Sequence, residues 1–341
     1  MNQELQPTYV TFLDKLLGGG TAPTGVYGIL GPTGIGKTHL ASMIASNGAT
    51  HGSISEDACR NSLPWVLFDI ETGRADSQQR ILSHCAKVKR ENVRNGHSEI
   101  QSYEQARLSE LLEMRGRFMS ERERHMHARN ALECRLRLIC QDDLLQESEE
   151  YGLEFKFTDF PKWIAECIDE IGSGTRLGGI VIDGVNNVWN YSQESTSMSE
   201  REFIQDFVDN FCRELSFTEQ CPVWVTHQVN GTACDASPVT PLSHREAARC
   251  KTFARSLDAC FVLGTPSEDT VFAIQCTRSK SGSAKLDRLL LTHDEDFATI
   301  VETDDYVEDK RNQTWKPRPK GNSLLDQAEL KNLDEMLKQA R

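Results

Sequence analysis

The sequence lacks the features that mark secreted, zinc-binding or membrane-spanning proteins. Its eleven cysteines include no Cys-x-x-Cys pair, the spacing typical of structural zinc sites and small redox motifs. No apolar run approaches the roughly 20 residues that cross a bilayer, and no basic flank followed by a long apolar segment opens the chain. We therefore expect a cytoplasmic protein with reduced cysteines and no membrane partner.

The chain also lacks an excess of positive charge. Its formal net charge of −13 argues against a protein that coats nucleic acid, because phosphate binding needs clustered Lys and Arg. The charge is uneven, however: between Lys87 and Arg137, twelve Lys or Arg stand against eight Asp or Glu. The sequence therefore predicts a basic segment on an acidic body.

A complete phosphate-binding pattern is present near the start of the chain. It follows the apolar run 26–30 and precedes the helix-like run 40–45, and its residues are Gly31, Pro32, Thr33, Gly34, Ile35, Gly36, Lys37, Thr38 and His39. The glycines allow backbone torsions that turn successive N–H groups inward, and the following helix adds its positive end. We expect this segment to bind ATP, with Lys37 on the β- and γ-phosphates and Thr38 on Mg²⁺.

Further apolar runs predict the strands of an α/β fold with a mostly parallel central sheet flanked by helices. The runs 64–71, 179–183 and 222–226 read as buried strands that end in polar residues, and ligands bind at the carboxyl ends of such strands. Asp183 ends one of them and is therefore our candidate for holding Mg²⁺. The runs 259–263, 271–277, 286–291 and 298–302 alternate with turn residues and predict closing strands.

Two carboxylates compete for the role of general base. Strand alternation sends Asp69 and Glu71 to the same face, so their spacing alone does not choose between them. Glu71 lies farther toward the carboxyl end, where the phosphates are expected, so we favour it for activating the attacking water. The other carboxylate would cap the helix that starts near Asp76.

The domain organisation follows from these segments. We expect an N-terminal lead-in over 1–25, an ATPase domain over 26–305, and a flexible linker with a short C-terminal helix over 306–341. Within the domain, the helix-forming stretch 85–150 reads as a helical insertion, with a hairpin that projects from the sheet.

The order of these motifs resembles that of the RecA-like P-loop ATPases, most of all the DnaB-type and phage replicative ring helicases, with RecA/RadA recombinases and KaiC-type ATPases as cousins. The resemblance rests on the phosphate loop, Glu71, Asp183, the run Thr226-His227-Gln228 and the run from Thr277 to Gly282. It implies that Gln228 and His227 sense the γ-phosphate. It also implies that Arg278 and Lys280 act on the nucleotide of a neighbouring subunit in a homo-oligomer, a hexameric ring or a filament. Because the usual lysine-before-arginine order is reversed here, the sequence leaves open which of the two contacts the γ-phosphate.

Three functional hypotheses follow from this resemblance. The first is a Mg²⁺-dependent ATPase motor, helicase- or translocase-like, that acts on single-stranded DNA through polar loops at 185–202 and 229–248. The second is a regulatory ATPase switch that recruits a protein partner through the insertion 85–150 or the C-terminal tail, without translocation. The third is a nucleotide-bound scaffold with negligible hydrolysis, which would require Glu71 to be misplaced.

Overall fold

The computed structural model describes most of the chain in two compact units. Unit 1 spans Met1–Glu302 and unit 2 spans Thr303–Arg341. The described residues are 5–53, 61–95, 121–140, 142–143, 160–171, 176–192, 198–229, 253–264, 271–280, 288–303, 306–309 and 314–317.

Unit 1 is built on a nine-stranded sheet with the order β3-β2-β4-β5-β1-β6-β7-β8-β9. The first six strands in this order are parallel, and β7, β8 and β9 close the sheet antiparallel. Their bounds are β1 Gly25–Gly31, β2 Trp65–Asp69, β3 Leu136–Cys140, β4 Gly179–Asp183, β5 Pro222–Gln228, β6 Ala259–Leu263, β7 Val271–Ser279, β8 Arg288–Asp294 and β9 Thr299–Glu302. The mostly parallel α/β sheet confirms the expected fold class. The four strands expected between residues 259 and 302 are present as β6 to β9, of which β6 is a parallel strand inside the sheet.

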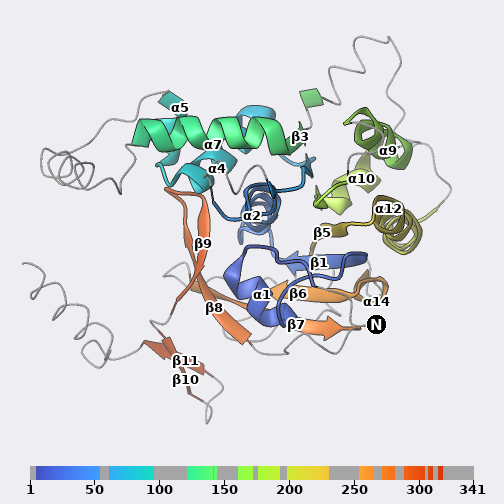
Figure 1. The fold of residues 1–341 in the computed structure, drawn as a ribbon. Helices are drawn as coiled ribbons and strands as arrows, with labels where there is room; N and C mark the ends of the chain where they lie inside the picture. Colours follow the sequence, from blue (N-terminus) through green and yellow to red (C-terminus); the bar gives the residue numbers. More distant parts are fainter. Residues whose placement is uncertain are drawn as a thin grey trace, which may run out of the picture. The chain divides into compact units, whose positions relative to one another are not determined.

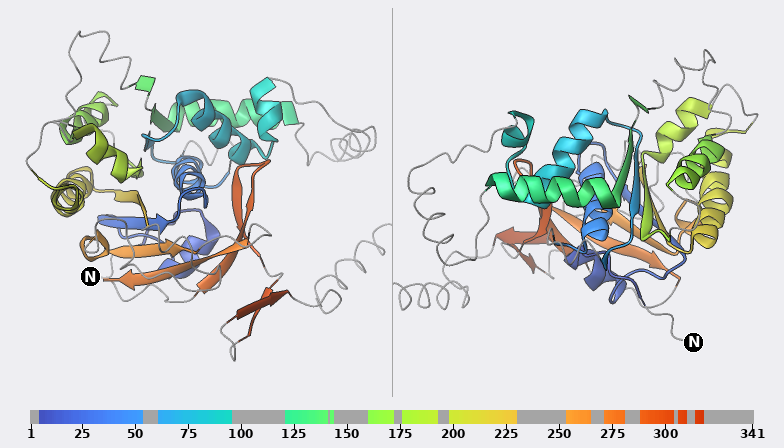
Figure 2. Two further views of the ribbon diagram at one scale, coloured as in Figure 1. Left: turned by 180° about the vertical axis from the view of Figure 1, so that it is seen from behind. Right: turned by 45° about the horizontal axis from the view of Figure 1, so that its top comes forward.

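The central strands are buried throughout, which explains their unbroken apolar composition. Every residue of β1, β2, β4 and β6 is buried, as expected for parallel strands covered on both faces. One face packs against α9 Phe160–Glu170, α10 Val185–Ser192, α11 Glu200–Asp206, the π-helix η3 Phe207–Cys212, α12 Arg213–Glu219 and α14 Phe253–Ser256. Figure 2 shows most of these helices as a layer on one side of the sheet.

The opposite face carries α1 Thr11–Leu17, α2 Lys37–Thr50 and α4 Arg74–Ala86. Outside α4 lies α7 Glu121–Arg135, and the short α5 Arg90–Asn95 follows α4 (Figure 1). The four apolar side chains of α1 are buried in this layer. The lead-in expected over 1–25 therefore contributes to the core of unit 1.

The expected helical insertion needs a correction. Its last part is a strand, since Leu136–Cys140 forms β3 and pairs in parallel with β2. The helix α7 packs along α4 and does not project from the sheet. Leu136 and Ile139 are three residues apart, a spacing that fits one face of a helix, but in β3 they pack on opposite faces of the sheet. A strand forms here because the edge of β2 offers backbone hydrogen bonds. Residues 96–120 of the insertion lie outside the described residues.

Two other expectations also change. The segment 185–202, expected to be a polar loop, contains α10 and the start of α11 within its described part, and 229–248 lies outside the described residues apart from Val229. In unit 2 the expected flexible linker contains the antiparallel hairpin β10 Tyr306–Asp309 and β11 Thr314–Pro317. The helix expected near 324–340 lies outside the described residues.

Candidate nucleotide-binding site

The phosphate loop connects β1 to α2, as its sequence predicts. Gly34 and Gly36 adopt φ of +81° and +99°, in the left-handed region where a side chain is strained, and Gly36 is the N-cap of α2. The Lys37 ammonium donates hydrogen bonds to Gly31 O at 3.0 Å and Pro32 O at 2.7 Å. The loop thus has the backbone needed to turn N–H groups toward an anion at the start of a 14-residue helix.

Asp183 brings a buried carboxylate to the same edge of the sheet. Its strand β4 is separated from β1 only by β5, and the side chain is 1% exposed. The pKa of Asp183 is raised from 3.8 to about 7, first by burial and then by the nearby Asp69 and Glu71, while the hydroxyl groups of Thr226 and Thr38 oppose the shift. The contact with Thr38 places the two proposed magnesium ligands side by side.

The donor set at this point suits a magnesium ion. Among the described residues, Asp183 Oδ2 is buried without a hydrogen-bond partner. A buried carboxylate oxygen without a partner is costly, and Mg²⁺ prefers hard oxygen ligands of this kind beside nucleotide phosphates. Asp183 and Thr38 therefore fit the cation that the phosphate loop implies.

The competing carboxylates Asp69 and Glu71 have different surroundings. Asp69 is fully buried and accepts hydrogen bonds from Thr72, from Ser77 Oγ at 2.5 Å and from Arg80 Nη1 at 3.1 Å. These partners occupy the Asp69 carboxylate and tie it to the start of α4. The sequence had led us to expect such a capping role for the carboxylate that is not the general base.

Glu71 lies beyond the end of β2, beside the loop. A Cβ placed on Gly184, the residue after Asp183, would lie 2.7 Å from Glu71 Cγ. The pKa of Glu71 is raised by the loss of water around its carboxyl group, with Lys37 opposing the shift and Asp69 adding to it. Although the residue as a whole is exposed, its carboxyl end therefore lies close to both Lys37 and the Asp183 carboxylate.

The comparisons with known proteins agree with this arrangement at the level of fold. No family model matches the chain, and no curated protein matches it. Solved structures do: the ATPase domain of a DnaB-like helicase superposes with a TM-score of 0.59 at 12% identity, covering 89% of this chain and 93% of the other.

The fold is RecA-like. Two more solved structures share it at low identity. A KaiC-like protein from the archaeon Pyrococcus horikoshii OT3 gives a TM-score of 0.52 at 12% identity, over 88% of this chain and 99% of that one. A DnaB-like replicative helicase, described with its interactions with primase, gives 0.54 at 13% identity over 88% of this chain and 62% of that one.

In this RecA-like sheet, strand alternation separates the two sensor candidates at the end of β5. Gln228 is paired in register with Gly31, the first residue of the phosphate loop. His227 is 1% exposed and stacks on Phe253, with ring centroids 4.7 Å apart. Phe253 belongs to the core on the other face of the sheet from α2. Gln228 therefore lies near the loop, whereas the His227 ring points away from it.

Arg278 and Lys280 lie at and just after the end of β7, two strands away from β1. Arg278 is in register with Cys260, which in turn pairs with Gly28, three residues before the phosphate loop begins. At 3.3 Å per residue this is about 10 Å along the strands, in addition to the two-strand separation across the sheet. Lys280 lies 3.5 Å from Asp258 Oδ1, so neither cation reaches the phosphate loop of its own chain.

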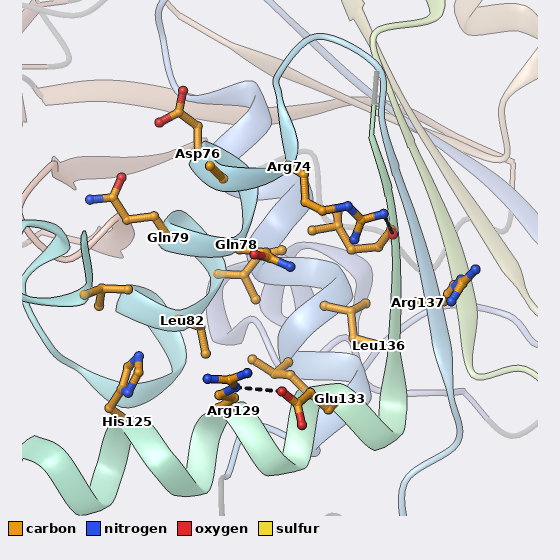
Figure 3. A pocket seen from close by; sticks show the side chains of 15 residues that line it. Arg74, Asp76, Gln78, Gln79, Leu82, His125, Arg129, Glu133, Leu136 and Arg137 are labelled. Atoms are coloured by element: carbon orange, nitrogen blue, oxygen red, sulfur yellow. Dashed lines mark hydrogen bonds and ion pairs between the residues drawn. The ribbon is translucent and has the colours of Figure 1, made fainter. Parts of the chain in front are cut away.

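A separate cavity of about 820 Å³ lies between α4, α7 and β3 (Figure 3). Its floor includes the buried Ile81, Leu132 and Leu138. On its rim Arg129 pairs with Glu133 at 2.7 Å, as the dashed line in Figure 3 marks. None of its described lining residues belongs to the phosphate loop.

Sequence reasoning missed several residues that shape the site. Ser77 and Arg80 of α4 donate hydrogen bonds to Asp69, and no local sequence pattern predicts such a contact. Gly184 could have been noticed, since a glycine directly after the metal-binding carboxylate indicates an unusual torsion, here φ +91°. Thr226 was quoted only as part of a motif, although alternation places it on the same face as Gln228.

Proposed function

We propose that this chain is an ATPase that binds Mg²⁺-ATP at the loop 31–38 and hydrolyses it. The observation that supports this most is the meeting of Lys37, Thr38 and Asp183 at the carboxyl edge of the parallel sheet, with Glu71 beside them. These side chains come from three segments, namely the start of α2, the end of β4 and the residues after β2, and each has the chemistry that phosphoryl transfer requires.

The proposed mechanism divides the work among these residues. Backbone N–H groups of the loop and the Lys37 ammonium hold the phosphates and stabilise the charge that develops on them. Magnesium, bound through Asp183 and Thr38, supplies further neutralisation of phosphate charge. Glu71 orients a water molecule in line with the γ-phosphate and accepts its proton as the oxygen–phosphorus bond forms and ADP leaves. Its raised pKa makes the carboxylate a better proton acceptor at neutral pH.

We further propose that the active form is a homo-oligomer. Arg278 and Lys280 lie too far from their own phosphate loop, so a catalytic role requires that they serve the site of an adjoining protomer. A cation supplied in this way accelerates comparable NTPases by about 10³–10⁵. Lys280 is already held by Asp258, which favours Arg278 as the residue that contacts the γ-phosphate.

The test of the ATPase is a pair of substitutions. Lys37→Ala is expected to abolish binding of a fluorescent ATP analogue, whereas Glu71→Gln is expected to bind it normally and lose turnover by about 10²-fold or more, as removal of a general base does. Turnover in Glu71→Gln at the wild-type rate would refute the role of this carboxylate. Wild-type protein that binds no nucleotide would refute the function itself.

The target is proposed to be single-stranded DNA, as for a helicase-like motor. The regulatory switch is the alternative, in which the insertion or the C-terminal tail recruits a protein partner. A several-fold rise in ATPase rate on adding single-stranded DNA, falling with salt, supports the motor, and an unchanged rate at low salt contradicts it.

A further inference from the structure

Thr226 joins two strands of the site through one buried hydroxyl group. It lies near the end of β5, between β4 and β1, and is 2% exposed. Its Oγ1 donates a hydrogen bond to Asp183 Oδ1 at 2.5 Å and accepts one from the Gly184 N–H at 2.8 Å. A hydroxyl has one proton to donate, and here that proton is committed to the proposed magnesium carboxylate.

This arrangement fixes how Asp183 presents its two oxygens. Because Oδ1 is held by Thr226, the carboxylate cannot rotate without breaking a buried hydrogen bond. Oδ2 is the oxygen left without a hydrogen-bond partner among the described residues. Partners that bond to metal ligands in this way orient the ligand and tune its affinity.

A further hydrogen bond joins the same two segments. The Gln228 backbone N–H donates to Asn186 Oδ1 at 3.2 Å, so the end of β5 is tied to the segment after β4 at Gly184 and again at Asn186. Gly184, the first of these points, also packs against Glu71. A displacement at Gln228 would therefore move the metal carboxylate and the support of the general base together.

We infer that Thr226 is a positioning residue that orients Asp183 for magnesium and couples the metal site to the strand that carries Gln228. The inference rests on the proposed function, since it concerns the same nucleotide site. A merely structural role for this hydroxyl predicts a different result: its loss would lower stability equally with and without metal, and the response to Mg²⁺ would be unchanged.

The experiment measures how Mg²⁺ enhances the binding of a fluorescent ATP analogue to the full-length chain. Thr226→Val keeps the shape and removes the hydroxyl, and we expect its half-saturating Mg²⁺ concentration to rise about 10-fold or more, within the range seen for such partners of metal ligands. Thr226→Ser restores the hydroxyl and should return this value to within about twofold of the wild type. Binding of the analogue in excess EDTA should be the same in all three proteins.

Thr277→Val is the matched control, because the Thr277 hydroxyl also donates to a neighbouring strand, to Cys260 O at 3.3 Å, but on β7, two strands away from β1. Its Mg²⁺ response should match the wild type. Melting temperatures establish folding, and if Thr226→Val unfolds, Thr226→Ala is titrated in its place. The inference would be overturned if the variant without the hydroxyl had the same half-saturating Mg²⁺ concentration as the wild type. It would also be overturned if Thr226→Ser did not recover the wild-type value. A wild type that binds no analogue would instead overturn the proposed function.

Discussion

Replacing Asp183 with Asn should stabilise the metal-free protein at neutral and alkaline pH. The Asp183 pKa is raised from 3.8 to about 7, first by burial and then by the neighbouring carboxylates Asp69 and Glu71. The folded protein therefore binds this proton more tightly than the unfolded chain does. The sign follows from linkage: the contribution of Asp183 to stability is fully present below about pH 4 and is lost as the pH rises through 7.

The size of the effect follows from the shift. A change of about three pH units, at about 1.36 kcal/mol per unit, gives an upper value of about 4 kcal/mol. Relaxation and water penetration reduce such figures, so we expect about 2 to 4 kcal/mol between pH 4 and pH 8. For a unit of this size, that corresponds to a change in Tm of about 4 to 8 °C.

The assay is thermal unfolding in EDTA, from pH 4 to pH 8, for the wild type and Asp183→Asn. The difference in Tm should be smallest near pH 4 and should grow toward pH 8 in favour of the variant. Comparing the two proteins at each pH cancels the titration of distant groups, so the difference reports Asp183 together with the carboxylates Asp69 and Glu71 that interact with it. Because Asn carries no charge, the variant should also lose the Mg²⁺ enhancement of nucleotide binding. A Tm difference that does not change with pH would refute the account of Asp183 as a destabilising, metal-seeking carboxylate.

Two further predictions concern neighbouring parts of the site. Gly184→Ala forces a side chain into φ +91° and against Glu71, so we expect about 1 to 2 kcal/mol of destabilisation and a drop in kcat. The control Gly52→Ala, at φ +69° away from the site, should lower stability without lowering kcat. An equal drop in kcat for both variants would contradict the placement of Glu71. Mixing Arg278→Ala with Lys37→Ala protomers should restore part of the ATPase activity that each variant lacks alone. In a mixed oligomer, the intact phosphate loop of an Arg278→Ala protomer can meet the intact Arg278 of a Lys37→Ala protomer. No recovery at any mixing ratio would argue against a role of Arg278 across protomers.

Much of the site was readable from local sequence. The phosphate loop was predicted because its glycine spacing, between an apolar strand-like run and a helix-like run, is typical of one particular backbone conformation. Asp183 was predicted because a carboxylate after an unbroken apolar run must lie at the carboxyl edge of a parallel sheet. On the described residues the four closing strands also lie where turn residues and alternation placed them.

Other features depend on contacts between distant segments. The spacing of Asp69 and Glu71 left their roles open, and they differ because Ser77 and Arg80 of α4 occupy one carboxylate, while the chain leaves β2 before the other. The spacing of Leu136 and Ile139 favoured one face of a helix, whereas both faces of β3 are covered and the edge of β2 decided that a strand forms. The alternation that separates His227 from Gln228 was readable, but which face carries the phosphate loop was not.

The sequence by itself determined the local groups of the candidate site: a glycine loop with left-handed torsions, a lysine and a threonine at the start of a helix, and acidic residues at strand ends. These follow from backbone torsions and side-chain periodicity, which act over a few residues. Only the tertiary structure decided which carboxylate is held and which lies beside the loop, that Thr226 links two strands, and that β7, which leads to Lys280, lies two strands away from β1. Such relations join residues tens to hundreds of positions apart, and only the packing of the sheet and its helices fixes them.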